Sequence, residues 1–121
     1  MNRQMWVGID LDGTLSSGYQ EQIGPPIPAM VRLVRKLISS GIEVRIFTAR
    51  ASGSRRMIDP VKAWVREVFG LDLPVTNVKT LECLMLVDDK ALSIAPNTGR
   101  FRTPEEMALA LEHMIAQHRT V

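Results

Sequence analysis

The sequence predicts an α/β fold, a three-layer Rossmann-like arrangement with a central parallel sheet and helices on both faces. Short apolar segments bounded by turn residues alternate with longer segments in which apolar residues recur at helical spacing. The short segments are apolar on both sides, as is typical of parallel strands covered by helices. With 121 residues, 45% of them hydrophobic and 23% charged, residues 1–121 are expected to form one globular domain.

The first half of the chain supplies two strands and one helix. The segment MWVGID at 5–10 is short, apolar and followed by Asp-Gly, so it predicts a buried strand. A helix is expected to begin at Pro28, because apolar residues then recur three and four positions apart. Ser39-Ser40-Gly41 should end this helix. The segment IEVRIFT at 42–48 is rich in β-branched residues and predicts the second strand.

A second helix is expected between Asp59 and Gly70. Asp59 is a suitable N-cap residue, and Pro60 suits the first helical position. Trp64 falls on the apolar face of this helix and is expected in the core. Gly70 should end the helix.

Two more apolar segments, at 74–79 and 83–89, predict the third and fourth strands. Thr103-Pro104-Glu105-Glu106 has the pattern of a capping box and predicts the start of a last helix. Each predicted strand ends in a polar residue, and these are Asp10, Thr48, Lys79 and Asp88. Ligands of such sheets bind beyond the carboxyl ends of the strands, so these side chains should share one edge.

Composition and charge limit the classes of protein to which the chain can belong. The net charge of +2 and the pI of about 9.0 do not by themselves indicate nucleic-acid binding. A single cysteine, Cys83, excludes an internal disulfide framework. The N-terminus lacks the pattern of a signal peptide, and no apolar run approaches the ~18 residues of a membrane span. A cytoplasmic protein with no membrane partner is therefore expected.

Four short motifs carry a resemblance to a known family. They are GIDLDGTL, IFTAR, NVK and LVDD, in that order along the chain. With them the chain resembles the haloacid dehalogenase superfamily of phosphohydrolases, in its small capless form. The resemblance implies a phosphatase that hydrolyses a phosphate monoester through an aspartyl-phosphate intermediate. It also implies that Mg²⁺ is the cofactor.

The residue types fit that chemistry. Asp10 would attack phosphorus, and Asp12 would protonate the leaving oxygen and later activate water. A divalent cation offsets the repulsion between a carboxylate and a phosphate dianion, and Mg²⁺ prefers oxygen ligands. The resemblance implies that Asp10, the main-chain carbonyl of Asp12, and Asp88 hold the metal. Asp89 would bind it through water or orient Lys79.

A further group of residues is expected to bind the phosphoryl group. They are Gly13, Thr14, Thr48, Ala49, Arg50 and Lys79. Gly13 permits the sharp turn after the first strand. Thr48 would donate a hydrogen bond to a phosphoryl oxygen, and Lys79 would neutralise charge there. Arg50 suits bidentate recognition of phosphate, whereas Arg55 and Arg56 are expected to be solvated.

Many members of this family carry a cap domain that closes over the site, but neither segment into which it would insert, 14–28 or 50–79, can hold one. The site is therefore expected to be open, unless an oligomer partner or the loop from Ser16 to Pro26 covers it. An open site admits a phosphorylated small molecule or a nucleic-acid end. The alternatives are a catalytically weak binding or regulatory protein on the same scaffold, and a nucleic-acid end phosphatase. A response-regulator receiver domain is disfavoured, because its acidic pair would follow the first strand, not the fourth.

Overall fold

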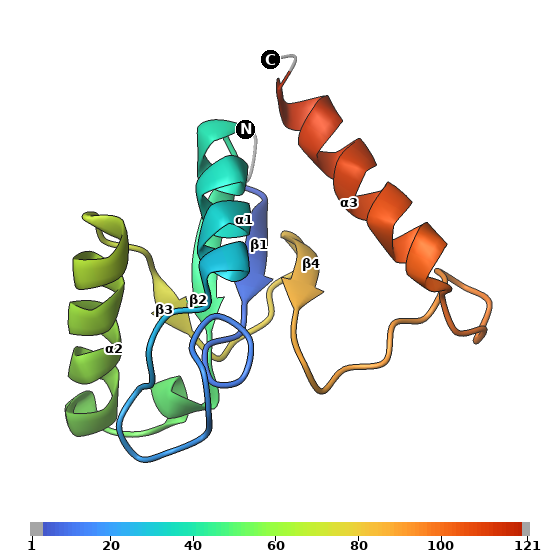
Figure 1. Ribbon diagram of the computed structural model, residues 1–121. Coiled ribbons are helices and arrows are strands. Elements are labelled where there is room, and N and C mark those ends of the chain that lie inside the picture. Colours follow the sequence, from blue (N-terminus) through green and yellow to red (C-terminus); the bar gives the residue numbers. More distant parts are fainter. Residues whose placement is uncertain (1–3, 120–121) are drawn as a thin grey trace. The chain divides into compact units, whose positions relative to one another are not determined.

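The computed structural model describes residues 4–119, which divide into two compact units. The first unit ends at Asp89 and the second begins at Lys90. In the first unit helices connect the first three strands and a short link without a helix leads to the fourth, and the second unit contains the C-terminal helix (Figure 1). The expectation that residues 1–121 form one domain stays a prediction.

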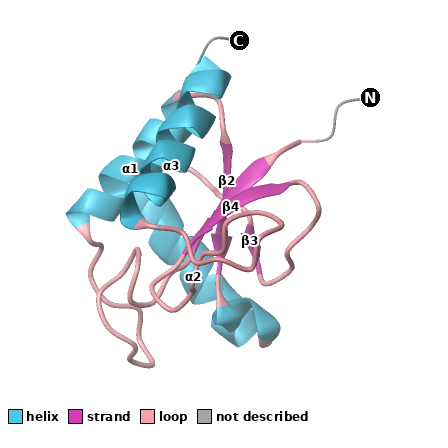
Figure 2. Ribbon diagram, turned by 90° about the vertical axis from the view of Figure 1, so that its right-hand side faces the viewer, coloured by secondary structure: helices cyan, strands magenta, loops and turns pink. Residues whose placement is uncertain are grey.

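The first unit is built on a four-stranded parallel sheet (Figure 2). Its strands are β1 (Trp6–Ile9), β2 (Glu43–Phe47), β3 (Val75–Thr76) and β4 (Cys83–Val87). Their spatial order is β3-β2-β1-β4, so β1 pairs with a strand on each side. The predicted α/β fold, a Rossmann-like parallel sheet flanked by helices, is confirmed. That helices cover both faces of the sheet stays a prediction. The third strand is much shorter than the predicted segment at 74–79.

Helices α1 (Pro28–Ser39) and α2 (Arg55–Phe69) connect successive parallel strands. Both crossovers run in the same direction across the sheet, and such crossovers are right-handed, so both helices cover the same face. Buried side chains from these strands and helices form the core, and they are Val7, Ile9, Val44, Ile46, Val34, Leu37, Val61, Val65 and Phe69. Each large apolar side chain buried in this way contributes about 1.5–3 kcal/mol before the loss of chain entropy is counted.

Trp6 organises the other face of the sheet. Its ring stacks on Phe47 with centroids 6.3 Å apart, and the Arg45 guanidinium lies 4.6 Å from the ring centre. The indole N–H donates a hydrogen bond of 2.8 Å to the Thr80 hydroxyl. Arg45 also pairs with Glu43 on the same face. Strand β2 is therefore apolar on one side and mixed on the other, although the sequence suggested strands buried on both sides.

The predicted start of α2 was wrong. The helix begins at Arg55 after Ser54, so Asp59 is not its N-cap and Pro60 lies inside it. The Ser54 carbonyl accepts hydrogen bonds from the N–H groups of Met57 and Ile58, which forms a turn ahead of the proline. Proline removes one N–H from a helix, and burial of the later residues offsets that loss. Gly70 ends the helix in the left-handed conformation, with φ 74°, as predicted.

The second unit contains α3 (Pro104–Arg119) and the predicted capping box. The Thr103 hydroxyl accepts a 3.1 Å hydrogen bond from Glu106 N–H, and the Glu106 carboxylate accepts one of 3.3 Å from Thr103 N–H. Arg100 pairs with the same carboxylate and, with these backbone contacts, lowers the pKa of Glu106 to about 2. Among residues 4–119, none of the helices combines the length and apolar character needed to cross a membrane.

Gly8 is expected to resist even a small substitution, because a Cβ atom there would meet three packed residues. It would lie 2.6 Å from Leu86 Cδ2, 2.9 Å from the Trp6 ring and 3.2 Å from Phe47 Cβ. We expect Gly8→Ala to lower the free energy of unfolding by about 1–3 kcal/mol, measured by urea denaturation. Leu86→Ala should relieve part of this loss in the double variant, and strictly additive losses would contradict the crowding explanation.

Candidate active site

The predicted site lies where the chain changes direction across the sheet. The connection from β1 leads to β2 on one side, whereas β4 lies on the other side of β1. Such a switch point leaves a crevice beyond the carboxyl ends of the two strands, where ligands of open α/β sheets bind. Asp10 follows β1, and its N–H donates a 2.9 Å hydrogen bond to the carbonyl of Val87. Asp88 and Asp89 follow Val87 directly, so both strands deliver carboxylates to this crevice.

Three carboxylates meet at this point. One oxygen from each of Asp10, Asp88 and Asp89 lies within 4.8 Å of the others. The Thr14 hydroxyl lies 3.1 Å from Asp10 Oδ2 and 3.2 Å from Asp89 Oδ1, so it bridges two of them. Three hard oxygen donors at this spacing fit a small divalent cation such as Mg²⁺. The structure thus brings together Asp10, Thr14, Asp88 and Asp89 from the predicted set.

The surroundings of Asp10 and Asp89 shift the pKa values of these two carboxyl groups in opposite directions. Burial, followed by the charge of Asp88, raises the pKa of Asp10 to about 6. A hydrogen bond from Tyr19 lowers the pKa of the exposed Asp89 carboxyl. Of this neighbouring pair, Asp10 therefore holds a proton more readily, and Asp89 stays ionised. A bound cation would favour the ionised form of Asp10.

The turn after β1 fixes the positions of these side chains. Gly13 has φ 83°, a left-handed conformation, and its N–H donates a 2.8 Å hydrogen bond to the Ser16 carbonyl. A Cβ at Gly13 would lie 2.6 Å from Asp89 Oδ2 and would also meet the Tyr19 hydroxyl. The buried Ser16 hydroxyl donates to the Leu11 carbonyl at 3.1 Å. Glycine at position 13 therefore allows both the turn and the approach of Asp89.

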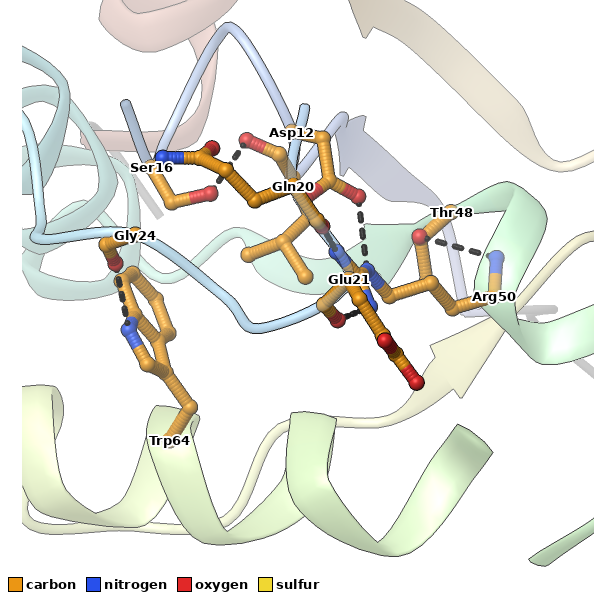
Figure 3. Close-up of polar contacts among 9 residues, drawn as sticks. Asp12, Ser16, Gln20, Glu21, Gly24, Thr48, Arg50 and Trp64 are labelled. Carbon is orange, nitrogen blue, oxygen red and sulfur yellow. Dashed lines mark hydrogen bonds and ion pairs between the residues drawn. The ribbon is translucent and has the colours of Figure 1, made fainter. Parts of the chain in front are cut away.

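Asp12 does not join the carboxylate cluster through its side chain. Its two oxygens accept hydrogen bonds of 2.8 Å from Arg50 Nε and Nη2, in a bidentate ion pair (Figure 3). The side chains of Asp12 and Arg50 are only 21% and 16% exposed, so solvent screens this pair weakly. The hydrogen bonds to Asp12 raise the pKa of the Arg50 guanidinium. Whether the main-chain carbonyl of Asp12 binds metal stays a prediction.

Arg50 also holds the loop that follows the turn. Its Nη1 donates to the Glu21 carbonyl and its Nη2 to the Gln20 carbonyl, both at 2.7 Å (Figure 3). The ends of this loop are joined by hydrogen bonds from Ser17 N–H to the Pro25 carbonyl, 2.9 Å, and from Ile27 N–H to the Leu15 carbonyl, 2.8 Å. One guanidinium therefore binds both the predicted general acid and the loop beside it.

The second strand delivers Thr48 to this region. Thr48 is 2% exposed, and its hydroxyl accepts a 3.2 Å hydrogen bond from Arg50 N–H as the cap of the short 3₁₀ helix η1 (Ala49–Ser52). The hydroxyl hydrogen of Thr48 is then left for another acceptor. Ala49 lies exposed at the start of η1, and its predicted contact with phosphate stays a prediction.

Lys79 is not brought to the carboxylates. It lies between β3 and β4, and in the described part of the chain its exposed side chain has no hydrogen bond or ion pair. Thr80 and Glu82, which follow it, bind Trp6 at the beginning of β1. The short link therefore leads toward the edge of the sheet opposite Asp10, because β4 must start there to run parallel to β1.

Tyr19 is a site residue that the sequence did not predict. Its hydroxyl donates to Asp89, which raises the pKa of Tyr19. Tyr19 is the single tyrosine of the chain and stands in a Gly- and Pro-rich loop soon after the first motif. That position could have indicated it, but only the fold of the loop brings residue 19 to residue 89.

Comparisons with known proteins identify the fold alone. No protein-family model matches the chain, and no curated protein matches it either. The chain is similar to the solved structure of a conserved protein from Bacteroides thetaiotaomicron, with a TM-score of 0.62 and 18% sequence identity. The similarity covers 95% of this chain and 93% of that one.

Asp10→Asn is expected to stabilise the metal-free protein at neutral pH. The pKa of Asp10 rises from 3.8 to about 6 on folding, so the folded wild type loses stability as pH increases through that window. The free energy of unfolding of the variant should match that of wild type near pH 4 and exceed it by about 1 kcal/mol at pH 7, allowing for solvent screening. Urea denaturation with a chelator measures this. The exposed carboxyl of Asp59, changed to Asn, is the control, and a pH-independent difference at Asp10 would contradict the assignment.

Arg50→Ala should release the loop, because it removes the guanidinium that binds two loop carbonyls and Asp12. Amide hydrogen exchange in residues 16–26 is expected to accelerate by at least about tenfold. Arg55→Ala removes an exposed arginine nearby and should leave exchange in the loop unchanged. Equal protection in wild type and Arg50→Ala would show that the loop does not depend on this contact.

Proposed function

We propose that this chain is a Mg²⁺-dependent phosphatase that hydrolyses a phosphate monoester through an aspartyl-phosphate on Asp10. One observation carries the proposal: Asp10 meets two further carboxylates at the switch point of a parallel sheet. The four motifs described above support membership of the haloacid dehalogenase superfamily, in a form without a cap domain.

Asp10 is the proposed nucleophile. A carboxylate oxygen of Asp10 attacks phosphorus, the bond from phosphorus to the leaving oxygen breaks, and the phosphoryl group is transferred to Asp10. The hydrogen bond of 3.1 Å from Thr14 to Asp10 Oδ2 fixes the rotation of this side chain. Water then attacks the phosphorus of the aspartyl-phosphate, which releases phosphate and restores the carboxylate.

Asp12 is the proposed general acid and base. It gives a proton to the leaving oxygen in the first step and takes one from the attacking water in the second. Both its oxygens are engaged by Arg50, so Asp12 must part from the guanidinium before it can carry that proton. A phosphate dianion offers Arg50 an alternative bidentate partner, and its arrival would separate the pair.

Asp10, Asp88 and Asp89 are the proposed ligands of Mg²⁺ through their side chains. Their oxygens have the hardness and spacing that this ion requires. When bound, the ion supplies positive charge that lowers the repulsion between the nucleophile and the phosphate. Asp89 is thus proposed as a direct ligand, a closer role than the outer position expected from the sequence.

The remaining predicted residues differ in how well their positions support a role. Thr48 is buried at the end of β2 with a hydroxyl hydrogen to donate, which suits a phosphoryl oxygen. Lys79 lacks any contact that supports the role predicted for it. We assign the cationic contact to Arg50, which is adjacent to Asp12.

A binding or regulatory protein on this scaffold is the second candidate. The observation that favours it is the engagement of Asp12 by Arg50 together with the position of Lys79, since neither is arranged for catalysis in this conformation. Such a protein would bind Mg²⁺ and phosphate without releasing product.

Phosphate release from an aryl phosphate separates the two candidates. Wild type should release phosphate only with Mg²⁺, Asp10→Asn should lose all activity, and Asp12→Asn should lose at least about 100-fold in kcat. Asp59→Asn, purified in parallel, should retain wild-type activity. Saturable Mg²⁺ binding without phosphate release from any substrate class tested would favour the binding protein, and equal release from wild type and Asp10→Asn would reject Asp10 as the nucleophile.

A further inference from the structure

A groove borders the proposed active site between loop residues 21–23 and helix α2. Its volume is about 820 Å³, and Arg50 forms part of its lining. Sites for small organic ligands usually measure about 300–1,000 Å³, so this groove can hold a molecule larger than phosphate. All its lining residues belong to the first unit of the chain.

The walls of the groove are largely apolar. Ile23 contributes from the loop, and Met57, Pro60, Ala63 and Trp64 contribute from α2. The Trp64 indole N–H donates a 3.0 Å hydrogen bond to the Gly24 carbonyl, which fixes the ring between helix and loop (Figure 3). A fixed indole, a proline ring and a thioether favour contact with the face of a planar ring.

The charges that line the groove cancel. Arg50 and Arg56 contribute two positive charges, and Glu21 and Glu67 contribute two negative charges. A polyanion such as an oligonucleotide would gain little from this lining and would meet both carboxylates. The carboxylates can instead accept hydrogen bonds from amino or hydroxyl groups of an uncharged ligand. The lining therefore suits a neutral, polar ring.

The position of Arg50 connects the groove to the chemistry. Arg50 contacts Asp12 on one side and lines the groove on the other. A general acid protonates the leaving oxygen, so the leaving group lies on the side of phosphorus that faces Asp12. With Arg50 between Asp12 and the groove, the leaving group extends past Arg50 into the groove.

We propose that this groove binds the leaving group of the substrate, an uncharged alcohol of nucleoside size that carries a planar heteroaromatic ring. The orientation of the substrate in this inference rests on the proposed phosphatase function. The binding of such a ring can nevertheless be measured without turnover. The proposed leaving group narrows the substrate to small monophosphate esters of ring-bearing alcohols and disfavours nucleic-acid ends.

Binding of adenosine tests the groove directly. Millimolar adenosine should shift the NMR signals of the Trp64 indole N–H and of the backbone of residues 21–23 and 57–64, whereas glycerol should not. Ala63→Trp would fill the groove from an exposed position, and Ala29→Trp makes the same change at an exposed position of α1 that does not line the groove. Adenosine shifts should disappear in Ala63→Trp and persist in Ala29→Trp. Absence of shifts in wild type, or shifts that survive in Ala63→Trp, would overturn the proposal.

Kinetics with paired substrates test the link to catalysis. Ala63→Trp should lower kcat/KM for adenosine monophosphate by at least about tenfold and leave kcat/KM for glycerol phosphate nearly unchanged. A wild-type preference for a phosphorylated oligonucleotide over adenosine monophosphate would overturn the assignment of a neutral leaving group. If no substrate releases phosphate but adenosine still shifts residues of the groove, the phosphatase proposal fails while the binding site stands.

Discussion

The position of the site depends on strand β1. All four of its residues are buried, and it forms parallel ladders with β2 and β4 at once. Because both ladders hold the strand, the residue after it has little freedom to move. Asp10 is placed there, and its own N–H continues the bonding to β4 through Val87. The pairing of β1 at the centre of the sheet therefore fixes the position of the proposed nucleophile.

The site has two sides that differ in charge. On one side three carboxylates lie together and offer a place for a cation. Burial, followed by the charge of Asp88, raises the pKa of Asp10 there. On the other side Asp12 is neutralised by Arg50. A phosphate dianion needs positive charge near both the attacking and the leaving oxygen. The proposed metal would supply it beside Asp10, and Arg50 would supply it beside Asp12.

Arg50 and the loop that it holds form a border of the proposed site. Arg50 holds the loop through the carbonyls of Gln20 and Glu21, and the loop places Tyr19 on Asp89 and Gly24 on Trp64. The site is thus bordered by a short segment of its own chain. The same segment forms one wall of the groove proposed to bind the leaving group.

The sequence by itself determined the order of the elements and the polar residues that directly follow β1, β2 and β4, which are Asp10, Thr48 and Asp88. Local sequence patterns correctly predicted β1, the start of α1 and the capping box at Thr103, because neighbouring residues determine these features. Tertiary structure decided the pairing of Asp12 with Arg50, the contact of Tyr19 with Asp89 and the position of Lys79. It also placed Trp64 half-buried at the groove, although its helical spacing predicted a core residue. These outcomes depend on the path of loops between distant strands, and residue spacing along the chain carries no information about that path.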